Sequence, residues 1–398
     1  MVYHPYVTTT KQQEMLERIN PLVERFHERA GEIDEQGRFP FENVEELKSA
    51  GYLSLTVPKK YGGEGIDLYD YVLLQERLAE GDGSTALSVG WHLGSVLEIE
   101  ESNTWHPATF GTVCDKVVQE KALLNRAATE KGTGSPTRGG MPATQAIHNG
   151  NGWEISGRKS FTSMAVALDY SLVTAQIEDT DRIGVFLINH RLQGVHVEDT
   201  WNMIAMRGTR SDDLVLDHVH VPEDALVEEE NQASGPSLPK AWLLHIPACY
   251  LGIARAARNY AIHFAETYQP NSLPGPIKEV PEVQRKIGEM ELSLFQAREM
   301  LYSVAARWVN HPEKRYEMAT ELGAVKHTAT NHAASVVDMA MRIVGARSLA
   351  QDNPLQRYYR DVRSGLHNPP MDDAVINALA KQALTEEEKN DSRTARSS

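Results

Sequence analysis

The segment VQRKIGEMELSLFQAREMLYSV, residues 283–304, does most to decide the fold. Its apolar residues recur every three or four positions, which places them on one face of a helix. They are Val283, Ile287, Met290, Leu294, Ala297, Leu301 and Val304. The pattern returns with Leu322, Val325, Ala329, Val336, Ala340 and Ile343. Two long helices with apolar faces need partners, so the C-terminal part is predicted to be an antiparallel helical bundle.

The sequence before this bundle is predicted to form a helical part followed by a β-part. Helical runs are expected over 11–31, 41–50 and 68–79, and Ser84 is expected to cap a further apolar helix. From Asn125 to about Gln232 short alternating apolar runs are typical of an antiparallel β-domain, with a hairpin turn at 149–152. We therefore expect a helical domain over 1–126, a β-domain over 127–232, a helical bundle over 233–385 and a frayed polar tail over 386–398.

Charge, cysteine content and the lengths of apolar runs exclude several classes of protein. The 398 residues include 40 Lys and Arg against 55 Asp and Glu, a formal charge of −15, whereas nucleic-acid binding needs a basic surface. Cys114 and Cys249 lie far apart, which indicates inert thiols in a reducing cytoplasm. No secretory signal and no apolar run of about 18 residues occurs. We expect a cytoplasmic protein that binds neither nucleic acid nor membrane.

Standard catalytic and metal motifs are not found. His218 and His220 share one face of a predicted strand, but no third ligand accompanies them, so no metal site is expected. The loop from Thr129 to Ser135 is rich in small hydroxyl residues. It is either a surface loop or a cradle for a phosphate or a heterocycle.

Several motifs together carry a family resemblance. They are VPKKYGGEGI (57–66), ATEKGTGS (128–135), GRKSFTS (157–163), MRGTRS (206–211), VHVP (219–222) and the pair Arg360-Asp361. These motifs occur in the order and with the spacing of the acyl-CoA dehydrogenase family, which the chain resembles over roughly residues 10–385. The resemblance implies an α+β fold with an N-terminal helical domain, a central antiparallel β-barrel domain and a C-terminal four-helix bundle. It places a flavin between the β-domain and the bundle.

The resemblance also assigns roles to residues of the β-domain. It implies that Thr129 and Ser135 contact flavin or substrate, that Phe161 covers a face of the isoalloxazine, and that Ser163 lies near its reactive nitrogen. An aromatic ring against the flavin face and a hydroxyl at its polar edge suit such a site. Substrate contacts are implied for Ser135, Arg207 and Ser211.

The sequence departs from the family at the catalytic base. Dehydrogenation needs a carboxylate to take the α-proton of the thioester. The usual glutamate position holds Pro369, and the alternative position falls near Trp242. Asp372 and Asp373 are the nearest carboxylates; they are candidate bases, or else charges at the start of a helix.

The signatures for FAD are altered as well. Phe264-Ala265-Glu266-Thr267 stands where the family has an arginine that reaches the pyrophosphate, and residues 342–348 replace the segment that cradles the adenosine. FAD is the cofactor that the resemblance implies, and FMN is the alternative.

A branch of the same fold fits some of these departures. The chain also resembles the two-component monooxygenases typified by dibenzothiophene monooxygenase, which receive reduced FMN from a separate reductase. In that branch histidines stabilise the oxygen adduct of the flavin, and His92 and His367 match their segments, with Ser163 as the hydroxyl partner. An imidazole in a dry pocket could donate the necessary hydrogen bond.

These observations lead to a first functional hypothesis and its alternatives. The first is flavin-dependent α,β-dehydrogenation of an acyl thioester, with acyl-CoA as substrate and a flavoprotein as electron acceptor. The alternative is reduced-flavin monooxygenation with a flavin reductase as partner, and a third class is a non-enzymatic scaffold. The apolar faces of the C-terminal helices further predict a homo-oligomer, a dimer or a homotetramer.

Overall fold

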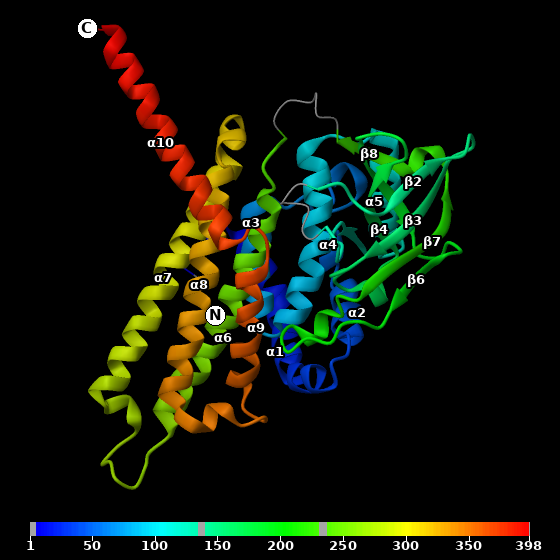
Figure 1. The fold of residues 1–398 in the computed structure, drawn as a ribbon. Helices are drawn as coiled ribbons and strands as arrows, with labels where there is room; N and C mark the ends of the chain where they lie inside the picture. Colours follow the sequence, from blue (N-terminus) through cyan, green and yellow to red (C-terminus); the bar gives the residue numbers. More distant parts are fainter. Residues whose placement is uncertain (1–4, 134–139, 231–236, 398) are drawn as a thin grey trace.

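The computed structural model describes residues 5–133, 140–230 and 237–397. Figure 1 shows three parts in chain order: a group of helices, a curled sheet and a bundle of long helices. This confirms the fold class predicted from the sequence.

The N-terminal part is helical. It contains α1 (Thr10–Gln36), α2 (Phe41–Ser49), α3 (Leu68–Ala79), α4 (Gly83–Ser102) and α5 (Pro107–Gln119). Helix α4 is buried over most of its length because it lies between the other helices, the sheet and the bundle. Its cap corrects the prediction for Ser84: the Asp82 carboxylate accepts the backbone N–H of Thr85 at 2.9 Å, so the cap lies two residues earlier and the helix begins at Gly83.

The middle part is an eight-stranded curled sheet. Its strands are β1 (Leu124–Ala127), β2 (Gln145–His148), β3 (Trp153–Lys159), β4 (Tyr170–Ile177), β5 (Ile183–Asn189), β6 (Val195–Glu198), β7 (Asp213–Val221) and β8 (Leu226–Glu230). The order is β6-β7-β3-β2-β4-β5-β8, with β1 also on β4. The predicted hairpin joins β2 to β3, with Gly150 at φ 88°.

The sheet differs from the prediction in one respect, because it is not wholly antiparallel. Strand β4 pairs in parallel with both β1 and β2. Parallel pairing needs a long connection, and more than twenty residues of chain separate each of these strands from β4. The alternation of apolar residues alone does not distinguish the two arrangements.

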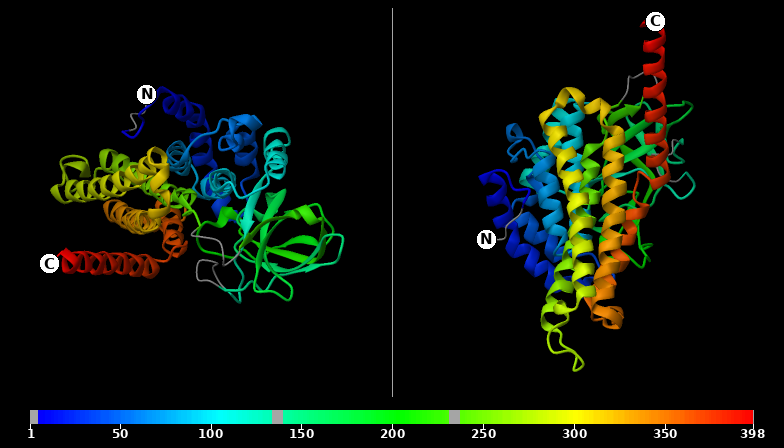
Figure 2. Two further views of the ribbon diagram at one scale, coloured as in Figure 1. Left: turned by 90° about the horizontal axis from the view of Figure 1, so that it is seen from above. Right: turned by 90° about the vertical axis from the view of Figure 1, so that its left-hand side faces the viewer.

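The C-terminal part consists of α6 (His245–Thr267), α7 (Pro281–Asn310), α8 (Ala319–Val344), α9 (Pro354–His367) and α10 (Asp372–Ser397). Figure 2 shows α6, α7 and α8 running side by side. Their predicted apolar faces are buried, including Met290, Leu294 and Leu301, which confirms the bundle.

Helix α10 projects from the body of the protein (Figure 1). Residues 386–397, expected to form a frayed polar tail, continue this helix. The segment has no Gly or Pro and contains Glu, Lys, Arg and Ala, which favour helix.

Candidate active site

A cavity of about 670 Å³ lies where the three parts meet. Its walls come from α4, from β1 and the chain after it, from residues 161–163 and 201–211, from the short 3-10 helix η7 (Ala241–Leu244), and from α6 and the end of α9. The volume falls within the range of about 300–1,000 Å³ common for ligand and cofactor sites. Thr129, Phe161, Ser163, Ser211 and His367, all named from the sequence, line it.

Phe161 is held in an unusual conformation at this cavity. Its φ of 57° lies in the left-handed region, which a bulky residue adopts only when its surroundings impose it. The Ser160 N–H donates to the Thr129 carbonyl at 2.8 Å, and the Thr162 N–H donates to the Asp212 carbonyl at 3.3 Å. These bonds fix the backbone on both sides, and 56% of Phe161 stays exposed. A flat aromatic surface is thereby presented to the cavity.

A row of hydroxyl groups forms a polar edge beside Phe161. The Thr209 hydroxyl donates to the Met206 carbonyl at 2.9 Å, so its oxygen can accept from Ser211 at 2.9 Å. If Ser211 donates in that direction, its oxygen accepts from Ser163, also at 2.9 Å. The row then runs one way and leaves lone pairs of Ser163 as acceptors.

Asn125 adds a second acceptor, which sequence reasoning missed. Its amide Nδ2 donates to the Ser163 carbonyl at 3.1 Å, and this contact fixes the orientation of the amide. Oδ1 is buried and has no hydrogen-bond partner among the described residues. A buried acceptor without a partner in a cavity wall indicates that a donor belongs nearby. Asn125 is the second residue of β1, and no motif marked it.

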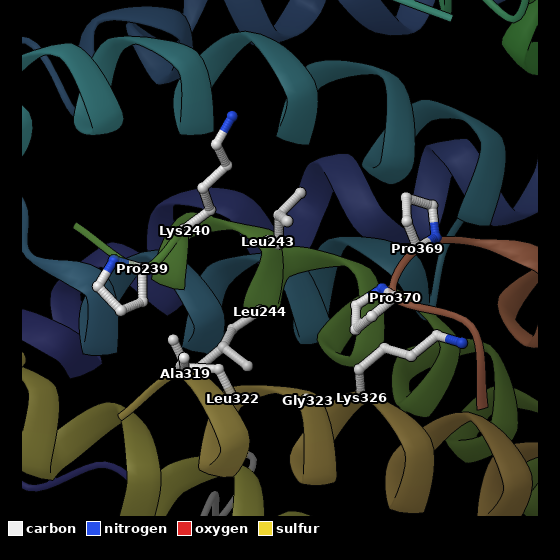
Figure 3. Close-up of a pocket in the computed structure, with 10 residues that line it drawn as sticks. All are labelled: Pro239, Lys240, Leu243, Leu244, Ala319, Leu322, Gly323, Lys326, Pro369 and Pro370. Atoms are coloured by element: carbon white, nitrogen blue, oxygen red, sulfur yellow. The ribbon is translucent and has the colours of Figure 1, made fainter. Parts of the chain in front are cut away.

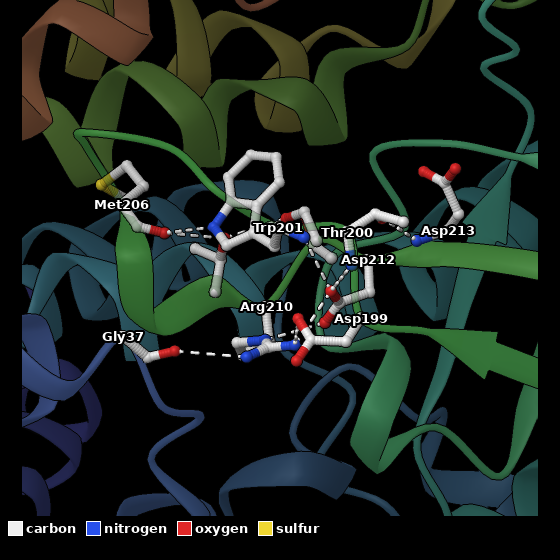
Figure 4. Close-up of polar contacts among 11 residues, drawn as sticks. Gly37, Asp199, Thr200, Trp201, Met206, Arg210, Asp212 and Asp213 are labelled. Atoms are coloured by element: carbon white, nitrogen blue, oxygen red, sulfur yellow. Dashed lines mark hydrogen bonds and ion pairs between the residues drawn. The ribbon is translucent and has the colours of Figure 1, made fainter.

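The loop that follows β6 is fixed by a buried carboxylate (Figure 4). Asp212 accepts the N–H groups of Thr200 and Trp201, each at 2.9 Å, and the Nε of Arg210 at 2.8 Å. The Trp201 indole N–H donates to the Met206 carbonyl at 3.1 Å. This network holds Trp201 edge-on to Phe161, with ring centroids 5.8 Å apart.

Helix α9 secures the same loop from the other side. Arg360 donates to Asp34 at 3.0 Å and to the Ile204 carbonyl at 2.5 Å. The Met206 N–H donates to Asp361 at 2.6 Å, and burial raises the pKa of that carboxyl to about 7. The Arg360-Asp361 pair identified in the sequence therefore fixes the part of the cavity wall that contains Ile204 and Met206.

Glu130 and Lys159 hold the chain after β1 against the sheet. Glu130 accepts Lys159 at 2.5 Å, the Thr144 hydroxyl at 2.7 Å and the Ala143 N–H at 2.6 Å. Burial opposes ionisation of Glu130, but the hydrogen bonds from Lys159 and Thr144 outweigh it and lower its pKa to about 2. The pair anchors the neighbouring Thr129.

The two predicted histidines do not meet. His367, the last residue of α9, lines the cavity, and the Tyr250 hydroxyl donates to the neighbouring Asn368 at 2.7 Å. His92 is fully buried, with Nε2 at 2.9 Å from the Leu53 carbonyl and Nδ1 accepting the Leu124 N–H. Burial lowers its pKa to about 4. Because His92 lies outside the cavity wall, its expected place beside the flavin is corrected.

The candidate bases also lie outside the cavity wall. Asp372 is bonded to Asn331 at 2.9 Å and to Lys326 at 3.4 Å, and Asp373 is exposed in the first turn of α10. Arg207, predicted to bind substrate, instead donates to the Asp34 carbonyl at 2.6 Å and is not part of the wall. The prediction for Ser135 falls outside the described residues.

A smaller cavity of about 180 Å³ adjoins the large one (Figure 3). Lys240, Leu243 and Pro369 belong to both walls. Its other side is formed by α8, including Lys326, whose pKa is lowered by burial. We treat it as part of the same site.

Within the described ranges no group of His, Cys, Asp or Glu could hold a metal ion. None of the described helices is long and apolar enough to cross a membrane.

The chain is similar to known proteins over most of its length. Three family profiles match: "Acyl-CoA dehydrogenase, N-terminal domain" at 9–102, "middle domain" at 125–219 and "C-terminal domain" at 244–368. A Bacillus subtilis (strain 168) protein named "Putative acyl-CoA dehydrogenase YdbM" is 54% identical over 95% of this chain and 99% of its own. The L-evernosamine nitrososynthase of a Micromonospora species is 28% identical over 93% and 90%. The crystal structure of FMN-bound TdsC from Paenibacillus superposes with a TM-score of 0.85, at 24% identity over 94% and 98% of the two chains.

Proposed function

The chain belongs to the acyl-CoA dehydrogenase family of flavin-dependent oxidoreductases, and we propose that within it the protein is a monooxygenase that uses reduced FMN. One observation carries the proposal: no described residue in the wall of the large cavity is a carboxylate, whereas His367 is part of that wall. Removal of the α-proton of a thioester lacks its usual base there. Oxygen chemistry needs a hydrogen-bond donor at that place, which an imidazole can supply.

The cavity suits an isoalloxazine ring. Phe161 offers an aromatic face, and Ser163 and Asn125 offer polar atoms at one edge. Flavin supplies redox chemistry with dioxygen when it is bound and reduced, and the protein supplies position and electrostatics. Reduced flavin carries a ring N–H that oxidised flavin lacks. Two acceptors at the polar edge therefore favour the reduced form.

FMN fits the altered FAD signatures better than FAD does. Arg347 lies over the ring of Tyr268 at 4.4 Å, within the segment where the family cradles adenosine. Residues 264–267 contain no arginine where the resemblance implies a cationic contact to pyrophosphate. TdsC, a protein of the same fold, is FMN-bound in its crystal structure. Under this proposal the partner is a flavin reductase and the substrate is a small molecule.

Dehydrogenation of an acyl thioester is the second candidate, because the 54% identical Bacillus protein is named for it. Within the described wall its proton acceptor would have to be His367.

Binding of reduced FMN tests the proposed function. Anaerobic titration followed by fluorescence should give a lower Kd for reduced FMN than for oxidised FMN or FAD. Admission of air should then produce an absorbance transient that matches neither reduced nor oxidised FMN before hydrogen peroxide appears. Equal affinity for all forms, with no transient, would count against the proposal.

Ser163→Ala should weaken binding of reduced FMN. The lost hydrogen bond is worth about 0.5–1.5 kcal/mol net, so the Kd should rise roughly twofold to tenfold. The Kd for oxidised FMN should change less, because only the reduced ring offers the N–H donor. Ser348→Ala, a buried serine outside the cavity wall, is the matched control. An equal loss for both redox forms would contradict the inferred direction of the hydroxyl row.

We also propose a homo-oligomer, dimer or tetramer, as the sequence predicts. Exposed apolar side chains on the bundle support it: Leu292 and Phe295 on α7, and Ile376 and Leu384 on α10. Light scattering at micromolar concentration should give a multiple of the 44.4 kDa chain, and a monomer would refute the proposal.

A further inference from the structure

An aromatic wall, formed by Trp91, Trp242 and His245, closes the large cavity between α4 and α6. The indoles of Trp91 and Trp242 line the cavity, with centroids 5.6 Å apart and an interplanar angle of 76°. His245 lies behind them, stacked on Trp242 at 5.9 Å and edge-on to Trp91 at 4.9 Å. His245 is fully buried, so the cavity does not continue past the wall.

Two glycines of α4 make room for these rings. A Cβ atom at Gly94 would lie 2.4 Å from Cε3 of Trp242, and one at Gly90 would lie 2.4 Å from Nδ1 of His245. Neither distance is compatible with a side chain unless the rings move. The helix therefore has a groove into which the aromatic wall fits, and the space between α4 and α6 is filled.

The wall carries no charge. Burial lowers the pKa of His245 to about 3, so its imidazole is neutral near neutral pH. Neither ring nitrogen of His245 has a hydrogen-bond partner among the described residues, and the same holds for the indole nitrogens of Trp91 and Trp242. The wall thus contributes packing and shape, and its indole N–H groups, unpaired within the part of the chain that the structure describes, are the only polar groups that it can offer to a ligand.

We propose that Trp242 is a specificity-determining residue that limits the depth of the substrate site. The substrate beside the flavin is therefore compact, and a long alkyl or acyl chain is excluded from the space between α4 and α6. This rests on the proposed function only in assigning the rest of the cavity to FMN.

A chain-length series of 1-alkanols, from 1-butanol to 1-dodecanol, tests the limit by calorimetry on the FMN-loaded protein. Each methylene that fits should lower the Kd about fourfold. In the wild type the Kd should stop falling at the chain length at which the alkanol contacts the aromatic wall; we call this length the limit. In Trp242→Ala the Kd should keep falling for at least two further methylenes. An alkanol two methylenes longer than the wild-type limit should therefore bind about 16-fold more tightly than the alkanol at that limit.

Three further variants keep the test decisive. Trp242→Leu serves if Trp242→Ala does not fold, and its limit should lie between those expected for the wild type and Trp242→Ala. Trp242→Phe should keep the wild-type limit. Trp153→Phe changes a buried indole of strand β3, outside the cavity wall, and should leave the limit unchanged. The same limit in every Trp242 variant, no limit in the wild type, or no alkanol binding would overturn the proposal. The series measures binding without turnover, and FMN binding is measured beforehand, so a failure of the proposed function is seen separately.

Discussion

His367→Ala should uncouple oxidation of reduced FMN from product formation, so that the electrons appear as hydrogen peroxide. The imidazole lies in the cavity wall, at the end of a helix whose following residue is fixed by Tyr250. Loss of a well-placed donor in an enclosed site costs about 10²–10³ in rate, roughly 2.7–4 kcal/mol. Stopped-flow absorbance with a peroxide assay should show the oxygen transient decaying faster by about that factor.

The controls for this prediction separate the imidazole from its surroundings. His196→Ala removes an exposed histidine on β6, outside the cavity wall, and should change neither decay nor peroxide yield. His92→Ala should lower stability, because it leaves the Leu53 carbonyl and Leu124 N–H without their partner, while a folded fraction keeps its peroxide yield. If the transient in His367→Ala lives as long as in the wild type, His367 does not stabilise it and has no part in the mechanism.

Lys159→Met should destabilise the protein by about 3–5 kcal/mol, because it leaves the Glu130 carboxylate buried without its cation. Lys159 is fully buried and lies 2.5 Å from Glu130. Chemical denaturation followed by circular dichroism should show the loss at neutral pH. Lys131→Met, a change at a largely exposed lysine paired with Asp213, is the control and should cost at most about 1 kcal/mol.

The same pair predicts a pH dependence with a definite sign. The folded pKa of Glu130, about 2, lies below the value of about 4.3 expected in the unfolded chain. Its contribution is therefore present above about pH 4.3 and is lost as the pH falls toward 2. Glu130→Gln should flatten the acid limb of the stability curve. A curve of unchanged slope would show that the pair does not set acid stability.

Much of the fold could be predicted because helical and strand periodicity report directly on buried faces. The stripe from Met290 to Leu301 and the hairpin at Gly150 are local signals, and both are found. Parallel pairing of β4 with β1 depends on the path of the connecting chain, which periodicity does not encode. The cap at Asp82 was not predicted, because Ser84, two positions later, is also of a residue type that favours N-caps.

The candidate site was predicted only where a residue type and its motif agreed. Phe161, Ser163 and His367 line the cavity, and their contact with flavin stays a prediction. His92 has the right neighbours in sequence, but helix α4 turns it toward Leu53 and presents Leu87 and Trp91 to the cavity instead. Asn125 and the aromatic wall depend on contacts between distant elements, so no local pattern marks them.

Anaerobic mixing of the protein, loaded with oxidised flavin, with a panel of acyl-CoA thioesters from short to long chain tests the central claim most directly. Absorbance of the bound flavin is followed, and dithionite reduction of the same sample verifies that the flavin can be reduced. We predict no bleaching by any thioester, because no described carboxylate lines the cavity. Bleaching accompanied by an equal amount of enoyl-CoA would contradict the assignment and establish the dehydrogenase.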